Sequence, residues 1–289
     1  MPAAGKLPGL DGLRAAAALA VFVDHAEQTQ EWVGRDHFDG NQMTSLGRQG
    51  VEVFFVLSGY LITLLLLRER ARFGAVSLPR FYARRTLRIW PLYYLVVFLL
   101  WVVLPWAVQF APPQIQALSE IHTRTLGAPG DPRLPLYLLF LANFSFWLYP
   151  HVLCGAHLWS LGVEEQFYLV WPVIFRFVPR PLAMFGALVV LVVSHRAAPS
   201  RLLDHPAVTW LGRRSYGFYM IHPLLMVLAM ALLEYGGRYS PALTRDGAPE
   251  HLVFYLLAFT LTAAGAWLSY RFLETPLLRA KDRYFTAHR

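Results

Sequence analysis

Long apolar runs recur along the whole chain, and several approach the length that crosses a bilayer. The hydrocarbon core is about 30 Å thick, so a spanning helix needs about 20 mainly apolar residues. A charged share of only 15%, against about 25% in average soluble domains, supports the same environment. Because backbone polar groups in lipid must be satisfied within the protein, the sequence predicts an all-α, polytopic transmembrane helix bundle that contacts the lipid bilayer directly.

We expect about eight spans and both termini in the cytoplasm. The predicted spans cover residues 10–26, 51–67, 89–108, 134–148, 161–178, 181–194, 208–233 and 252–272. The sixth has an apolar run of only about a dozen residues, which fits a re-entrant or tilted piece as well as a crossing. Basic residues concentrate on the side that becomes cytoplasmic when the sixth segment is kept as a crossing, so the positive-inside rule favours keeping it.

Charge and cysteine content exclude several other classes of protein. Lys6 precedes an apolar stretch as in a signal peptide, but Asp11 and Arg14 would interrupt its apolar region, so we expect an uncleaved first helix. The single cysteine, Cys154, excludes an intrachain disulfide and a multi-cysteine zinc site, and no metal is expected. The net charge of +8 is accounted for by the positive-inside bias, so we expect no nucleic acid partner.

Four ionisable residues lie within or beside the first apolar segment, at Asp11, Arg14, Asp24 and His25. An ionisable residue at such a position pairs with another group or lines a polar path, so it marks a candidate functional site. On a helix, Asp11, Arg14 and His25 share one face, with His25 about 16 Å from Arg14 along the axis. Asp24 points about 100° away, and we expect it to be a charge at the helix end.

The most basic stretch of the chain joins the second and third predicted spans. One interpretation is a topology anchor beside anionic lipid headgroups. The other is a phosphate-binding surface, since guanidinium groups match phosphate oxygens bidentately. On a helix, Arg84, Arg85 and Arg88 would form one compact cationic face that binds a cytoplasmic cofactor. The two interpretations are compatible.

Polar residues also begin the fifth predicted span. Ser160 could cap this helix, with Glu164 and Glu165 near the first turn, where negative charge is favourable. Alternatively, Ser160, Glu164 and Tyr168 form a polar face that lines the same cavity as His25, with a buried carboxylate orienting that histidine. Glu164 and Glu165 would then also offer a proton-sharing pair.

A further polar face is predicted in the 208–233 span. Ser215, Tyr219 and His222 are spaced there at four and three residues, which places them on one side of a helix. A lone histidine on such a face is more often structural, so Tyr219 and His222 are secondary candidates for the site.

Six strings of this sequence carry a family resemblance. They are Leu10-Asp11-Gly12-Leu13-Arg14 with ten residues before His25, residues 50–62, residues 81–85 continuing to Pro91, Trp159-Ser160-Leu161 with residues 164–168, Ser215-Tyr216 with His222-Pro223, and residues 272–276. In this order they resemble the acyltransferase-3 family of multi-spanning membrane O-acyltransferases. The resemblance covers most of the chain, so we expect residues 1–289 to form a single acyltransferase domain.

The resemblance implies an activity and a site. Such enzymes move acetyl or other short acyl groups, usually from acyl-coenzyme A, to hydroxyls of surface glycans, lipid-linked sugars or secondary metabolites. It implies that Arg14 and His25 are the catalytic pair. We expect acyl-CoA, with acetyl-CoA foremost, as donor substrate, no permanently bound cofactor, and a location in the bacterial plasma (inner) membrane.

A mechanism combines this chemistry with the helix geometry. His25 would act as general base on an acceptor hydroxyl or take the acyl group as nucleophile, with Asp11 or Glu164 orienting it. Arg14, nearer the cytoplasmic end, would neutralise donor phosphate or the developing oxyanion.

One departure from the family leaves alternatives open. Between residues 172 and 211 there is room for one short helix, whereas relatives usually total roughly ten spans. The shorter centre could narrow the acceptor cavity, require a homodimer, or mark a catalytically inactive relative. A transporter or flippase, with Arg14, His25 and Glu164 as a relay, is the alternative of another class.

Overall fold

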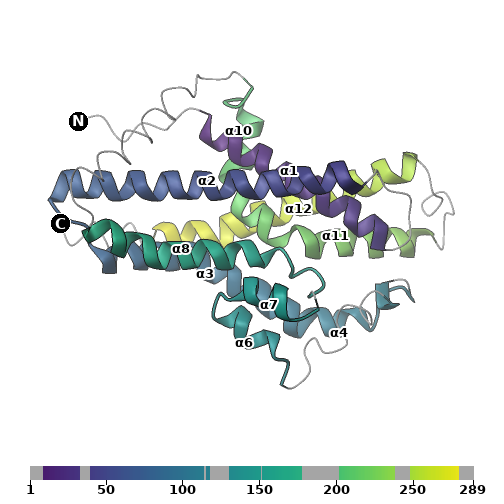
Figure 1. Cartoon of the computed structure of the whole chain (residues 1–289). Helices are drawn as coiled ribbons and strands as arrows, with labels where there is room; N and C mark the ends of the chain where they lie inside the picture. Colours follow the sequence, from purple (N-terminus) through teal and green to yellow (C-terminus); the bar gives the residue numbers. More distant parts are fainter. Residues whose placement is uncertain are drawn as a thin grey trace.

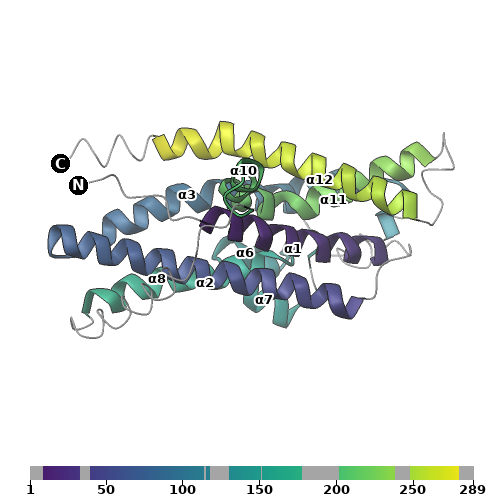
Figure 2. The same ribbon diagram turned by 90° about the horizontal axis from the view of Figure 1, so that it is seen from above.

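The fold is a bundle of long helices that lie side by side. It is seen in a computed structural model that describes residues 9–32, 40–113, 115–117, 130–150, 152–177, 202–237 and 248–279. Most of the described residues are helical, short connections join the helices, and none of the described residues is in a strand. The short helices α6 and α7 lie along one side of the bundle (Figure 1). Seen from above, α1 runs through the middle, between α2 and α12 (Figure 2).

The helix bounds follow the chain in order. They are α1 (Leu10–Trp32), α2 (Gly40–Phe73), α3 (Leu78–Phe98), η1 (Leu99–Val103), α4 (Leu104–Val108), α6 (Arg133–Leu138), α7 (Ala142–Leu148), α8 (Leu158–Phe177), α10 (Pro206–Arg213), α11 (Ser215–Gly237), α12 (Ala248–Ser269) and η3 (Tyr270–Glu274). The π-helical turn η1 directly follows α3, and the π-helical turn η3 directly follows α12. Each long helix therefore continues into its π-helical turn without an intervening loop.

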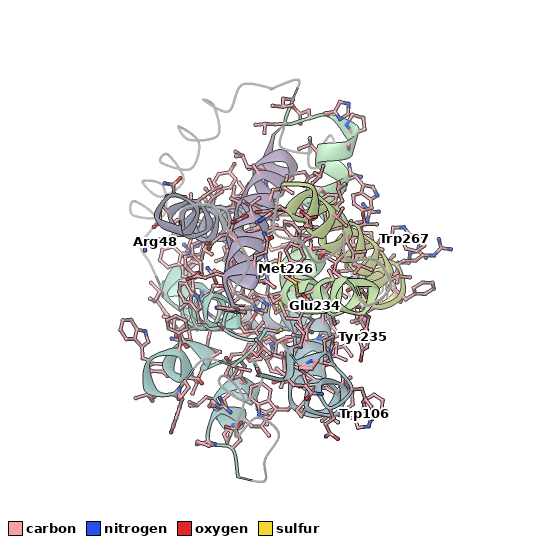
Figure 3. All side chains as sticks on the ribbon, turned by 90° about the vertical axis from the view of Figure 1, so that its right-hand side faces the viewer. Arg48, Trp106, Met226, Glu234, Tyr235 and Trp267 are labelled. Carbon is pink, nitrogen blue, oxygen red and sulfur yellow. The ribbon has the colours of Figure 1, made fainter. Side chains whose placement is uncertain are left out.

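Four of the described helical segments are long and apolar enough to cross a membrane. They are Ser45–Phe73, Leu78–Val108, Ser215–Gly237 and Glu250–Arg279. Trp106 and Trp267 project from the periphery of the bundle, whereas Met226 is fully buried at its centre (Figure 3). This outward apolar surface and the span lengths identify an integral membrane protein.

Two predicted spans are wrong as continuous helices. The 134–148 segment is divided into α6 and α7, because Phe140 has a positive φ of 57° and stacks its ring on Tyr93 at 4.1 Å. The 208–233 segment is divided at Arg214 into α10 and α11. The predicted spans 10–26 and 161–178 form α1 and α8, while the sixth segment, 181–194, lies outside the described residues.

Small residues allow α1 to pack closely inside the bundle. Ala15, Ala17 and Ala18 are buried on α1, and a Cβ at Gly50 of α2 would lie 2.7 Å from the Ala17 carbonyl oxygen. In lipid, helices associate largely through such close van der Waals packing rather than through the hydrophobic effect. The segment that carries Arg14 and His25 is therefore held rigidly between its neighbours.

The contact between α10 and α1 leaves no room for a side chain at Gly212. A Cβ there would overlap the backbone carbonyl of Asp11. We expect Gly212→Ala to force α10 away from α1 and to destabilise the fold by about 1–3 kcal/mol, the usual cost of overpacking. The lower thermal midpoint can be measured in detergent by intrinsic fluorescence.

The matched control is Gly59→Ala in α2. A Cβ at Gly59 would meet no atom within 4 Å, so we expect a neutral or slightly stabilising effect, because alanine favours helix over glycine by about 1 kcal/mol. Equal losses in the two variants would contradict the close packing of α10 on α1.

Candidate active site

A cavity of about 360 Å³ lies between α1, α2, α3, α8 and α11. We call it the arginine cavity, because among the described residues Arg14, Arg68, Arg85 and Arg88 line it together with two carboxylates, those of Asp11 and Glu164. Arginine groups gathered in a low-dielectric space attract anions more strongly than they would in water. The arrangement suits a ligand with several phosphate groups.

The predicted face of three arginines is only partly present in this cavity. Arg85 and Arg88 line it, but Arg84 does not. The Arg84 guanidinium instead pairs with the Glu69 carboxylate of α2, with 2.8 Å between Nη2 and Oε2. Arg68 of α2, which was not among the predicted cofactor-binding residues, also lines the cavity.

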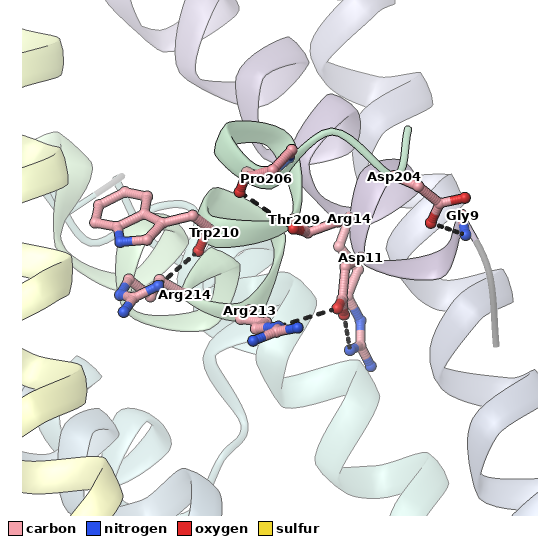
Figure 4. Close-up of polar contacts among 9 residues, drawn as sticks. All are labelled: Gly9, Asp11, Arg14, Asp204, Pro206, Thr209, Trp210, Arg213 and Arg214. Carbon is pink, nitrogen blue, oxygen red and sulfur yellow. Dashed lines mark hydrogen bonds and ion pairs between the residues drawn. The ribbon is translucent and has the colours of Figure 1, made fainter. Parts of the chain in front are cut away.

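Asp11 lies in the first turn of α1, between two arginines. Its carboxylate oxygens are 3.9 Å from the Arg14 Nη1 atom and 3.4 Å from the Arg213 Nε atom (Figure 4). His25 is fourteen positions beyond Asp11 on this helix, which is about 21 Å at 1.5 Å per residue. Asp11 is therefore too far from His25 to orient it as expected, and its carboxylate instead pairs with Arg14 and Arg213.

The two glutamates of α8 point to different surroundings. The Ser58 hydroxyl donates to the Glu164 carboxylate, which lines the arginine cavity. Glu165 accepts a hydrogen bond from the Trp90 indole at 3.3 Å and lines neither of the cavities described here. The two carboxylates therefore have different hydrogen-bond partners.

A second cavity, of about 670 Å³, lies farther along α1. We call it the histidine cavity, because His25 and His157 line it. Aromatic rings and polar groups line it as well, among them Phe55, Phe146, Trp32, Trp159, Asp24, Gln28, Arg48 and Glu52. Neither Arg14 nor Glu164 lines this cavity. The polar face of α8 and His25 therefore line different cavities, whereas the sequence predicted that they line the same one.

Asp24 is not the helix-end charge that the sequence predicted. Helix α1 continues for eight residues beyond it, to Trp32, and Asp24 is buried on the histidine cavity. Its carboxylate accepts a hydrogen bond from Gln28 at 3.1 Å and packs against Gly47, where a Cβ would overlap it.

Three histidines meet beside the second cavity. The Nδ1 atom of His25 lies 2.7 Å from the Nε2 atom of His222, and the ring centroid of His157 is 5.4 Å from that of His222. His222 is almost fully buried and does not line the cavity. It therefore contacts His25 from the side that faces away from the cavity. None of the groups of His, Cys, Asp and Glu in the described part of the chain is arranged to hold a metal ion.

Tyr219 stands where the two cavities meet. It lines both, together with Val51 and Phe55 of α2. Its hydroxyl lies 2.6 Å from the Ser160 Oγ atom, and both hydroxyls lie within 3.1 Å of the His157 carbonyl oxygen. The Ser160 hydroxyl is therefore bonded inside the protein, next to the place where the cavities meet. Ser160 lies within α8, which begins at Leu158, so the prediction that it caps this helix is wrong.

The sequence-based candidates thus divide between two cavities. Tyr168 lines the arginine cavity, where its ring lies 5.2 Å from the Arg85 guanidinium carbon. His157 was not a candidate, although a histidine directly before an apolar helix was a visible signal. The helix period alone could not show that Arg14 and His25 belong to separate cavities, because the side chains between them come from α2 and α11.

Comparisons with a family sequence model and with curated proteins both point to acyltransferases. The sequence model of the acyltransferase-3 family, described as an acyltransferase domain, matches residues 7–183. The O-acetyltransferase OatA of Staphylococcus aureus strain NCTC 8325 is 34% identical over 171 residues, which is 59% of this chain and 25% of that protein. A putative O-acetyltransferase of strain COL is 33% identical over 168 residues, 58% of this chain and 24% of that protein.

These matches cover about a quarter of the length of the curated relatives. No solved structure matches the chain.

Proposed function

Because the chain belongs to the acyltransferase-3 family, we propose that it transfers an acetyl or other short acyl group from acyl-CoA to a hydroxyl of an acceptor. The donor binds in the arginine cavity, and the acceptor binds in the histidine cavity. The observation that carries this proposal is that two cavities of different chemistry meet at Tyr219. A cluster of cations lies on one side of this junction, and a candidate base lies on the other.

The donor site is supported by charge. Four arginines and two carboxylates line the arginine cavity, which leaves an excess of positive charge for the phosphates of coenzyme A. The basic residues at this end of α2 and α3 support a position on the cytoplasmic side under the positive-inside rule, where acyl-CoA is made. With about eight crossings and both termini inside, the histidine cavity would face the outside of a bacterial plasma membrane.

The acceptor site is supported by its lining. Trp32, Trp159 and Phe146 supply flat apolar surfaces, and Asp24 and Gln28 supply groups that bond hydroxyls. This combination fits a surface glycan, a lipid-linked sugar or a secondary metabolite that carries sugar-like hydroxyls.

The reaction follows from these positions. His25 removes the proton of the acceptor hydroxyl, whose oxygen attacks the thioester carbon. An O–C bond forms, the C–S bond breaks, and the proton passes from His25 to the departing thiolate of coenzyme A. The Tyr219 hydroxyl, where the two cavities meet, supplies a donor for the developing oxyanion when it turns from the Ser160 and His157 oxygens toward the substrate. Arg14, about 16 Å from His25 along the helix, acts on donor phosphate.

The test is acyl transfer by the purified chain in nanodiscs. Acetyl-CoA labelled in the acetyl group is supplied with a panel of glycan and macrolide acceptors, and free thiol is measured in parallel. We expect label on an acceptor hydroxyl with one thiol released per group transferred. Labelled acetyl-CoA that is bound or moved without thiol release would instead indicate a transporter or an inactive relative.

A further inference from the structure

We propose that His222 is the positioning residue of this reaction: it fixes the tautomer of His25 so that the Nε2 atom of His25 is the base. The inference rests on the proposed function for the role of His25. The hydrogen-bond chain itself is independent of any activity. It runs from His25 through His222 to the backbone carbonyl of Tyr219, and both of its links are 2.7 Å long.

The direction of this chain follows from its last member. The Tyr219 carbonyl oxygen can only accept, so the Nδ1 atom of His222 carries a proton and donates it. In a neutral imidazole the other nitrogen is then an acceptor. The Nε2 atom of His222 therefore accepts from the Nδ1–H group of His25. The Nε2 atom of His25 is left with its lone pair free.

A proline makes the last carbonyl available. In an α-helix the carbonyl of residue 219 would accept from the N–H group of residue 223. That residue is Pro223, inside α11, and proline has no N–H group. The vacant carbonyl of Tyr219 is taken by the His222 ring one turn away. The sequence from Tyr219 to Pro223 thus fixes the tautomer of His222, because Pro223 leaves the Tyr219 carbonyl free to accept from the Nδ1–H group of His222.

The two rings are also held in place. Their planes differ by only 9° with centroids 5.0 Å apart, the geometry of rings joined edge to edge by an N–H···N bond. Phe22, Tyr219 and His157 surround the His222 ring with centroids 5.4 to 6.4 Å away. His222 is almost fully buried, whereas His25 is partly exposed to the cavity. His222 therefore acts through His25 and does not touch the acceptor.

This arrangement avoids a buried charge. A carboxylate behind His25 would orient it equally well, but an unpaired charge inside a membrane domain is costly. A neutral imidazole backed by a carbonyl dipole orients the base without that cost. When His25 takes a proton, the positive charge is stabilised by the Nε2 lone pair of His222 and, beyond it, by the Tyr219 carbonyl.

The first test reads the tautomer directly. Protein labelled with ¹⁵N in its histidine rings is studied by solid-state NMR in nanodiscs, with a His25→Gln sample to assign the His25 signals. We expect the His25 proton on Nδ1 in the native chain and its loss from that position in His222→Leu. A His25 proton on Nε2 in the native chain would overturn the proposal, whether or not the chain transfers acyl groups.

The second test measures kcat and KM in variants of His222. We expect His222→Leu to lower kcat by on the order of 100-fold, as when the partner that orients a catalytic histidine is removed, with the KM for acyl-CoA unchanged. His222→Gln, whose amide oxygen can accept from His25, should recover part of kcat. Equal activity of the Leu and Gln variants would contradict a positioning role through this hydrogen bond.

A third variant restores the missing N–H group. Pro223→Ala lets the Tyr219 carbonyl accept within the helix, so we expect a lower kcat from competition for that carbonyl. The matched control is Pro91→Ala, also inside a helix, where the vacant carbonyl belongs to Leu87, which lines neither cavity. A loss in Pro91→Ala as large as in Pro223→Ala would show a general helix effect and count against the proposal.

Discussion

Replacing His25 with alanine should reduce acyl transfer by about 10³-fold or more. General bases contribute roughly 10²- to 10⁴-fold to rate, and in the described structure His25 is the histidine that both lines the cavity and bonds His222. Binding of acyl-CoA should be unchanged, because the arginine cavity does not include His25. The measurement is labelled acetyl transfer at saturating donor, with equilibrium binding of acetyl-CoA in parallel.

A control separates this effect from a general loss of histidine. His205 caps α10 from an exposed position, and it lines neither cavity, so His205→Gln should retain native transfer. Transfer at the native rate in His25→Ala would refute the mechanism.

The same assay distinguishes a base from a nucleophile. If His25 takes the acyl group itself, labelled acetyl-CoA without acceptor should leave label on the native protein and none on His25→Ala. The mechanism proposed here predicts no label on either protein. Stable label on native protein alone would replace the direct transfer with a two-step route through His25.

Helix content and the membrane class could be predicted from the sequence because both depend on local composition. The breaks at Phe140 and Arg214 could not be predicted, since the apolar composition continues through both of them. A left-handed residue such as Phe140 is stabilised by its tertiary contact with Tyr93, which no local pattern encodes. Span counts based on hydropathy are therefore least certain where two short helices replace one long helix.

The site shows the same division between local and distant information. Helix periodicity put Arg14 and His25 on one face of the first helix, and in the structure each of them lines a cavity, although not the same one. The partner of His25 could not be found this way, because His222 is 197 residues away in the sequence. The spacing from Tyr219 through His222 to Pro223 was nevertheless visible, and the missing N–H group of proline is the physical signal that explains it.

The second large effect concerns the donor. We expect the double change Arg85→Gln and Arg88→Gln to weaken acyl-CoA binding by roughly 10²- to 10⁴-fold. A hydrogen bond to a charged group contributes about 1.5–3 kcal/mol, and a factor of ten corresponds to about 1.4 kcal/mol. Both guanidinium groups line the arginine cavity, beside Arg14 and Arg68. The loss should appear in Kd and KM, because neither residue lines the cavity of His25.

Arg84→Gln is the matched control for this experiment. Arg84 carries the same charge on the same helix, but it pairs with Glu69 and does not line the cavity. The Arg84 side chain is one-third exposed, and such pairs contribute about 0–1 kcal/mol, so we expect little change in donor binding. A loss equal to that of the double variant would favour the single three-arginine face that the sequence suggested.

Acetyl-pantetheine then tests whether phosphate is the group recognised. This donor keeps the thioester and lacks the nucleotide and its phosphates, so it cannot pair with the guanidinium groups. Native protein should use it poorly, and the double variant should use it about as well as the native protein does. If the double variant instead loses the same factor with both donors, Arg85 and Arg88 support the shape of the cavity, and the phosphates of coenzyme A bind elsewhere.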